Sequence, residues 1–179
     1  SPKDFQPIYK EASLKKSPAL SMAETVKDTI KSRKIAFLIA DGVDMTSLNE
    51  MKKALEDEQA TVELIAPKLG ATKGMKNEEL PADESFLTAA SVLYDAVFVP
   101  SGEKSMAALS QEPDAIHFIN EAYKHCKAIA FADNSSALLD KTQLKGAKDP
   151  GLLIGSKGNL VKDFITAIAK HRVWERENA

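Results

Sequence analysis

The residues best placed to do chemistry lie in a polar turn between an apolar run and a short stretch that favours helix. This turn consists of Ala132, Asp133, Asn134, Ser135 and Ser136. A strand, a tight turn and a short helix form the frame of a nucleophile elbow, which raises one side chain above a sheet and directs backbone amides at an oxyanion. The raised residue here is Ala132 or Asp133, and neither is a Ser, Cys or Thr. The frame is therefore present without a nucleophile at its raised position.

The two serines of this turn lie beyond the raised position, and each would need a neighbouring base to act as a nucleophile. The histidines offer none, because His117 and His125 fall on the preceding predicted helix and His171 falls on the last. No two histidines have the spacing of metal ligands. We therefore expect Ser135 and Ser136 to cap the short helix and the histidines to lie on helix surfaces.

Cys126 is the only cysteine, so the sequence excludes an intrachain disulfide and a cysteine-rich metal site. It ends the helix predicted over 114–125, upstream of the elbow. A thiolate needs a nearby cation or a helix N-terminus, whereas the C-terminus of a helix has the opposite field. We expect a structural, partly buried cysteine.

Four carboxylates could converge above the sheet: Asp41, Asp44, Glu103 and Asp133. A pair of carboxylates could carry out acid–base chemistry or hold a divalent cation. The alternative, which we favour, is that short acidic side chains cap turns and helix starts. The helix start at Glu103 could also receive an anion, but the sequence there lacks the further glycines of a phosphate loop.

The elements that must position these residues are short apolar strands alternating with helices. The predicted strands are 35–40, 62–66, 96–99, 128–132 and 152–154. Their continuous apolar runs are typical of a parallel sheet covered on both faces. We therefore expect an α/β, doubly wound and mainly parallel sheet of five strands or slightly more, in the flavodoxin-like order 2-1-3-4-5, with helices on both faces. Ligands of such sheets bind beyond the carboxyl ends of the strands, where the polar clusters fall.

Capping patterns and turn-forming residues locate the connections. Ser47-Leu48-Asn49-Glu50 and Ser21-Met22-Ala23-Glu24 each fit a capping box that begins a helix. Asn159 can cap the last helix. The turn-rich residues 68–87 predict a short hairpin or an irregular excursion.

Composition indicates one globular domain with an extension. The chain has 179 residues, of which 44% are hydrophobic and 28% charged, with a formal net charge of −2. These values argue against overall disorder and against nucleic-acid binding, which needs a basic excess. No apolar run approaches the roughly 20 residues of a membrane span.

Residues 1–33 are expected to form a connector with a short helix over 21–32, and residues 34–179 to form the domain. The first part of the connector holds three of the eight prolines, which is typical of an extended lead. The chain begins with serine rather than methionine, so either a leader was removed or the chain is a piece of a longer one. The connector also carries apolar residues without an assignable partner: Phe5, Ile8, Tyr9, Leu14, Leu20 and Met22.

Two of these patterns together resemble the ThiJ/PfpI family of the class I glutamine-amidotransferase-like superfamily. They are Val99–Glu103 after a strand, and the strand and elbow over 128–139. Active members of that family carry an acidic residue after the first strand and a cysteine at the elbow. Asp44 stands near the acidic position, whereas Ala132 or Asp133 stands at the elbow. The resemblance implies a flavodoxin-like fold with a vestigial site that has lost the family's peptidase, glyoxalase and deglycase chemistries.

Further segments, spread over about residues 17–176, resemble the C-terminal domain of large-subunit haem catalases of the fungal type. These segments are Ser17–Met22, Arg33–Ala36, Ala40–Asp44, Phe86–Ala89, Tyr94–Val97 and His171–Arg176. The resemblance implies a homotetrameric parent whose haem lies in a core upstream of this chain. Catalases hold haem through a tyrosine with an arginine four residues before it. None of Tyr9, Tyr94 and Tyr123 has this spacing.

We expect a non-catalytic accessory domain that stabilises the parent catalase, with the core domains as its partner and no cofactor, nucleic acid or membrane of its own. The alternative is a holdase that binds unfolded clients without ATP, since the sequence has no phosphate loop. A third hypothesis is a residual hydrolase that uses Asp44 and Asp133. The apolar residues of the connector are the expected contact for the parent or a client. The compartment of the parent, cytoplasmic or secreted, stays open.

Overall fold

The computed structural model describes residues 29–155, 159–173 and 176. The apolar residues of the connector, from Phe5 to Met22, and the capping box at 21–24 lie outside the described residues. Of the helix expected over 21–32, only residues 29–32 are described, and they contain a turn rather than a helix.

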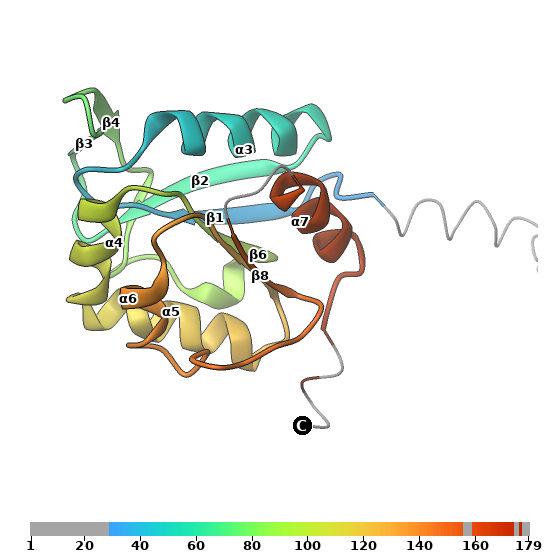
Figure 1. Ribbon diagram of the computed structural model, residues 1–179. Coiled ribbons are helices and arrows are strands. Elements are labelled where there is room, and N and C mark those ends of the chain that lie inside the picture. Colours follow the sequence, from blue (N-terminus) through green and yellow to red (C-terminus); the bar gives the residue numbers. More distant parts are fainter. Residues whose placement is uncertain (1–28, 156–158, 174–175, 177–179) are drawn as a thin grey trace, which may run out of the picture.

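A parallel sheet of six strands forms the centre of the described part, in the order β5-β2-β1-β6-β7-β8 (Figure 1). The strands are β1 Lys34–Leu38, β2 Thr61–Ala66, β5 Glu84–Ser85, β6 Ala96–Val99, β7 Ala128–Phe131 and β8 Leu152–Ile154. All neighbouring pairs are parallel. Without β5 the order is the expected 2-1-3-4-5, so the prediction of a doubly wound α/β fold is confirmed.

The sixth strand, β5, is the one that the apolar pattern did not indicate. Its two residues pair with Ile65 and Ala66 at the end of β2. Asp83 aligns it, because its backbone amide donates to the Leu64 carbonyl and its carboxylate accepts from the Leu64 amide at 2.8 Å. A strand this short has no hydrophobic period, so only its pairing defines it.

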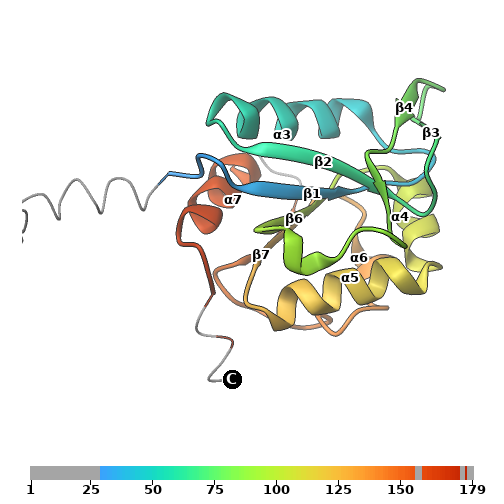
Figure 2. The ribbon, with the colours of Figure 1, turned by 180° about the vertical axis from the view of Figure 1, so that it is seen from behind.

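Helices cover both faces of the sheet. Those in the described residues are α3 Met45–Asp57, α4 Glu103–Ser110, α5 Pro113–Lys124, α6 Ser136–Leu139 and α7 Leu160–Ala169. Ile35 and Phe37 of β1 belong to the core that α3 and α7 close, while Ala36 and Leu38 belong to the core under α4, α5 and α6. Figure 2 shows α3 above the sheet and α5 below it. None of the helices in the described ranges has the length and apolar content needed to cross a membrane.

The turn-rich segment after β2 contains the expected hairpin. Its strands, β3 Ala71–Lys73 and β4 Glu79–Pro81, are antiparallel. The loop after β1 holds it in place, because the Gly42 amide donates to the Lys73 carbonyl at 2.7 Å and the Asp41 carboxylate accepts from the Lys73 amide at 2.9 Å. Asp41 therefore fixes a turn, as the capping alternative proposes for the acidic residues.

Helix α3 begins earlier than the capping pattern predicts. Its N-cap is Asp44, whose Oδ1 accepts from the amides of Thr46 and Ser47 at 2.9 and 3.5 Å. The prediction of Ser47 as the cap was wrong, because an upstream carboxylate already satisfies the free amides of the first turn. Ser135 and Asn159 occupy the N-cap positions of α6 and α7, but neither side chain makes a capping hydrogen bond. The capping role expected of these two side chains is thus not observed.

Candidate functional site

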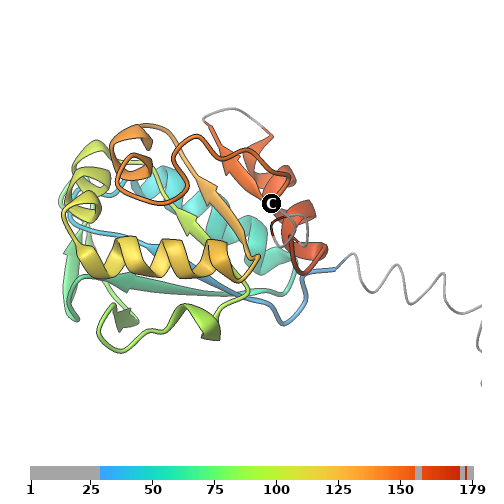
Figure 3. The same cartoon turned by 90° about the horizontal axis from the view of Figure 1, so that it is seen from below.

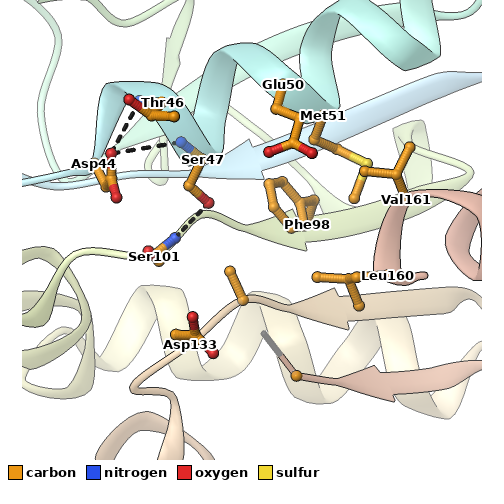
Figure 4. Close-up of a pocket in the computed structure, with 12 residues that line it drawn as sticks. Asp44, Thr46, Ser47, Glu50, Met51, Phe98, Ser101, Asp133, Leu160 and Val161 are labelled. Carbon is orange, nitrogen blue, oxygen red and sulfur yellow. Dashed lines mark hydrogen bonds between the residues drawn. The ribbon is translucent and has the colours of Figure 1, made fainter. Parts of the chain in front are cut away.

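Three loops that follow strands meet at one pocket at the carboxyl edge of the sheet (Figure 4). Asp44 follows β1, Ser101 follows β6 and Asp133 follows β7, and all three line a cavity of about 220 Å³. The structure thus brings these residues together, as the strand order leads one to expect for a doubly wound sheet.

Most of the remaining lining is apolar. It includes Met51 of α3, Phe98 of β6, Ala132 after β7, and Leu160 and Val161 of α7. Glu50 of α3 adds a third carboxylate, which Figure 4 shows directed toward Phe98. Sequence reasoning placed Glu50 only in a capping box. Glu50 follows Ser47 by three residues, and this spacing places both side chains on one face of a helix. That spacing is the sequence signal that could have placed Glu50 in the pocket.

The carboxylate of Asp44 is not free, since it caps α3 through the amides of Thr46 and Ser47. The Asp44 amide donates to the Ser101 carbonyl at 2.8 Å, and the Ser47 hydroxyl accepts from the Ser101 amide at 3.1 Å. These bonds join the loops after β1 and β6 into one wall of the pocket. A residual hydrolase would need Asp44 as a free acid or base, and this geometry does not support it.

The same junction requires a glycine at position 102. Gly102 has a φ of 131°, which L residues rarely adopt. A Cβ there would lie 2.6 Å from the Gly42 carbonyl oxygen and 2.9 Å from the Asp44 amide nitrogen. The close approach of the two loops therefore depends on the absence of a side chain.

The other acidic candidates do not reach the pocket. Asp41 is bonded to the hairpin, and Glu103 lies in the first turn of α4, where a negative charge is favourable. The possible convergence of four carboxylates is thus reduced to Asp44 and Asp133, with Glu50 added. Within the described ranges, no group of three His, Cys, Asp or Glu side chains could hold a metal ion.

The turn after β7 has the frame of an elbow and no nucleophile. Ala132 and Asp133 both line the pocket, and the Ala132 amide donates to the Val99 carbonyl at 3.0 Å. Asn134 takes the left-handed conformation of the turn, with φ at 67°, which asparagine tolerates better than most residues. Ser135 is buried and does not line the pocket. Which of Ala132 and Asp133 matches the elbow position stays a prediction.

None of the histidines lines this pocket. His117 of α5 lies 3.8 Å from Glu121 on the helix surface, as expected, and His125 is the C-cap of the same helix. His171 was wrongly placed on the last helix. Helix α7 ends at Ala169, because the chain turns into a positive φ of 72° at His171, whose Nδ1 is hydrogen-bonded to the Arg33 guanidinium.

Cys126 is buried at the other end of β7 from the pocket. It follows the last turn of α5 with a φ of 62°, and its Sγ lies 4.0 Å from the Lys124 carbonyl. The expected burial of Cys126 is confirmed, and Cys126 does not line the pocket at the elbow.

The described tyrosines do not fit a haem ligand. The buried Tyr94 donates its hydroxyl to Glu63 Oε1 at 2.6 Å. Burial and that hydrogen bond raise the pKa of Tyr94 far above its ordinary value, which disfavours the phenolate that would bind iron. Burial also raises the pKa of Tyr123, and the Arg176 guanidinium lies over its ring at 4.2 Å.

Solved structures with this architecture define the class of protein. A DJ-1 superfamily protein from Salmonella typhimurium superposes with a TM-score of 0.64 at 20% identity, over 82% of this chain and 96% of that one. DJ-1beta of Drosophila melanogaster gives 0.65 at 16% identity, over 79% and 91%. At these identities the likeness concerns the fold alone. The chain has a DJ-1/ThiJ/PfpI-like, flavodoxin-like fold, and neither Ala132 nor Asp133 in its elbow turn is a Ser, Cys or Thr.

Sequence comparison then defines the family. Residues 31–178 match the C-terminal domain found in long catalases. Catalase HPII of Pseudomonas aeruginosa is 38% identical over 166 residues, which cover 92% of this chain and 23% of that protein. Catalase HPII of Mycobacterium avium is 40% identical over 175 residues, which cover 89% and 25%. The chain belongs to the family of C-terminal domains of long catalases, and it spans about a quarter of the length of these relatives.

The expectation of a fungal type has weak support. Catalase-1 of Neurospora crassa is 28% identical over 175 residues, which cover 83% of this chain and 24% of that protein. This identity is lower than those of the two bacterial relatives. The family is confirmed, whereas the identities do not favour a fungal source.

Proposed function

We propose that this chain is a non-catalytic accessory domain of a long catalase. The observation that carries the proposal is the elbow turn, where Ala132 and Asp133 line the pocket and neither is a nucleophile, while the neighbouring Asp44 carboxylate caps α3. The raised position of the elbow therefore offers no nucleophile, and the Asp44 carboxylate is not free to act as its base. The decomposition of hydrogen peroxide, and the haem that it needs, belong in this proposal to the part of the parent upstream of the domain.

The proposed role is to stabilise the parent, which we expect to be a homotetramer. The domain has a buried core on each face of its sheet, so it offers a folded body rather than a tail. Docked domains within one chain bury roughly 600–1,500 Å², and buried apolar surface stabilises by about 25 cal/mol per Å². Such a contact would slow the thermal unfolding of the parent without entering its chemistry.

The test compares the full-length parent with a variant that lacks residues 34–179. We expect the same initial rate of peroxide decomposition per haem from both proteins at 25 °C, and a several-fold faster loss of activity from the variant on heating. Equal rates of thermal inactivation would overturn the stabilising role. A lower initial rate per haem would contradict the non-catalytic role.

A second candidate function is holdase activity of the isolated chain, and a set of exposed apolar side chains favours it. Leu87, Val92 and Leu93 are 83, 67 and 59% exposed, all between β5 and β6. We call these three residues the apolar edge strip. Unfolded clients expose apolar segments that such a surface could cover. The connector residues expected to make this contact lie outside the described residues, so the strip is a different surface from the one expected.

Light scattering of a heat-aggregating enzyme, with an equimolar amount of this chain and no ATP, tests the holdase. The double variant Val92→Ser, Leu93→Ser should lose about half or more of the suppression. The double variant Leu69→Ser, Met75→Ser is the matched control, because these two side chains are 59 and 60% exposed outside the strip. Scattering equal to that with an inert protein of similar size would end this proposal.

A further inference from the structure

The apolar edge strip lies on a segment that the fold holds firmly. The rings of Phe86 and Tyr94, just before and just after the strip, both pack on Phe118 at centroid distances of 6.0 and 5.8 Å. Between them, the Ser91 carbonyl accepts a hydrogen bond from the buried Lys127 Nζ at 2.7 Å. The backbone that carries the strip is therefore anchored on both sides and in the middle.

Exposed apolar residues gather on this segment rather than scatter over the surface. The described part of the chain exposes six large hydrophobic side chains: Leu69, Met75, Leu87, Val92, Leu93 and Ile154. Half of them fall within residues 87–93. Figure 3 shows residues 84–94, in green, along one edge of the molecule. Single exposed apolar residues need no explanation, whereas a gathering of them marks an interaction surface.

The strip ends where the polypeptide enters the domain. The Lys34 amide donates to the Asp95 carboxylate at 2.8 Å, and the Asp95 amide donates to the Lys34 carbonyl at 2.7 Å. Arg33 lies 3.9 Å from the same carboxylate, and the Lys34 ammonium lies over the Tyr94 ring at 5.0 Å. The residues just before β1 are therefore bonded to those just after Leu93, and the chain that precedes the domain joins it beside the strip.

We infer that the apolar edge strip is the surface on which this domain docks against the upstream body of the catalase polypeptide, an inference that rests on the proposed function. The domain corresponds to 23–25% of its relatives and is C-terminal in them, so about three quarters of such a polypeptide precedes it. The described chain that leads from that body enters the domain at Arg33 and Lys34, beside the strip. A tether gives its partner an effective concentration up to the millimolar range, which a free unfolded client does not have.

Site-specific photo-cross-linking in the full-length parent tests this inference directly. The probe is p-benzoylphenylalanine in place of Leu93, with the same replacement of Met75 as the matched control. The two side chains are 59 and 60% exposed. The Met75 amide bonds to the Val43 carbonyl at 2.8 Å, which places it at the opposite end of β1 from the entry point. We expect the probe at 93 to cross-link to peptides upstream of this domain, and the probe at 75 to give several-fold less of that product.

Three results would overturn the inference: equal yields from both positions, no product from 93, or cross-links from 93 to the same strip of a second chain. Thermal inactivation of the parent gives an independent readout. The Val92→Ser, Leu93→Ser parent should inactivate nearly as fast as the parent without the domain, while the Leu69→Ser, Met75→Ser parent should keep the wild-type rate. If deletion of the domain accelerates inactivation and the strip variant does not, the docking inference fails and the accessory function stands. If deletion has no effect, the proposed function itself fails.

Discussion

The ion pair between Asp149 and Arg176 fixes the C-terminal end of the described domain. No local sequence motif indicates this pair, because the two residues are distant in the sequence. Arg176 Nε and Nη2 donate to the two Asp149 oxygens at 2.8 and 3.1 Å, and the side chains are only 4 and 10% exposed. Nη1 also donates to the Lys127 carbonyl at 2.6 Å. This one guanidinium therefore links the C-terminal segment to the loop before β8 and to the chain between α5 and β7.

We predict that Asp149→Asn destabilises the isolated chain by about 3 kcal/mol at pH 7, because loss of one partner leaves a buried charge uncompensated. Burial alone would raise the pKa of Asp149, but the hydrogen bond and charge of Arg176 outweigh it and lower the pKa below its ordinary value. The contribution is complete above the unfolded pKa of about 4, and is lost as the pH falls through the lower folded pKa. Urea unfolding between pH 7 and pH 3 measures this dependence.

The matched control for this prediction is Asp57→Asn. Asp57 pairs with Lys53 at 2.9 Å, but both side chains are well exposed, so the change should leave the free energy of unfolding unaltered. A wild-type to Asp149→Asn difference that stays constant down to pH 3 would contradict the ionic origin of the effect.

The burial of Cys126 leads to a second prediction at this scale. Because the thiol is 2% exposed, it should not react with a disulfide reagent in the folded chain, and it should react with one equivalent after unfolding in urea. The reaction is measured by the absorbance of the thiolate that the reagent releases. Cys126→Ser should also leave peroxide decomposition by the parent unchanged, since the proposed function assigns that reaction to the part of the parent upstream of this domain. Fast reaction of the native thiol would show that the burial is misassigned.

Among the elements, the contact between the loops after β1 and β6 holds one wall of the pocket together. The Asp44 amide bonds to the Ser101 carbonyl across this contact, and the elbow turn after β7 lines the same space. Gly102 permits the approach, because its missing Cβ leaves room for the Gly42 carbonyl.

We therefore predict that Gly102→Ala destabilises the chain by about 3 kcal/mol, through both backbone strain and the clash between loops. Gly70→Ala should cost only about 1 kcal/mol, because Gly70 also has a positive φ, at 110°, but nothing lies within 4 Å of the added Cβ. Urea unfolding of the two variants checks the difference. Equal destabilisation would mean that the contact between the loops contributes nothing.

On the scale of the whole molecule, the described domain is a two-sided α/β body that needs no other chain to bury its sheet. We predict that the isolated chain unfolds in one cooperative transition, binds no haem and releases no oxygen from peroxide. The Tyr94 hydroxyl is committed to Glu63, and the Tyr123 ring is covered by Arg176. Titration with hemin should show no Soret band of bound haem, with the full-length parent as the positive control. A bound-haem spectrum accompanied by oxygen release would refute this prediction.

Local sequence patterns were sufficient to predict the central sheet and the type of residue at its elbow. The continuous apolar runs predicted five of the six strands, because burial on both faces makes each run apolar throughout. The rule that crossovers are right-handed then favoured the observed order of these five strands. The absence of a nucleophile at the elbow and the buried Cys126 also followed from residue type and position along the chain. Such features depend on neighbours in sequence, so the chain alone determines them.

Only the tertiary structure decided what depends on neighbours in space. Strand β5 exists through its pairing with β2, and Asp44 caps α3 where the local pattern favoured Ser47. Glu50 joins the pocket because α3 packs on the same face of the sheet as α7, whose Leu160 and Val161 line the same cavity. Arg176 pairs with Asp149, which is distant in the sequence. The exposure of Leu87, Val92 and Leu93 has the same origin, since an apolar residue in a sequence is presumed buried until the packing of every other element leaves it uncovered.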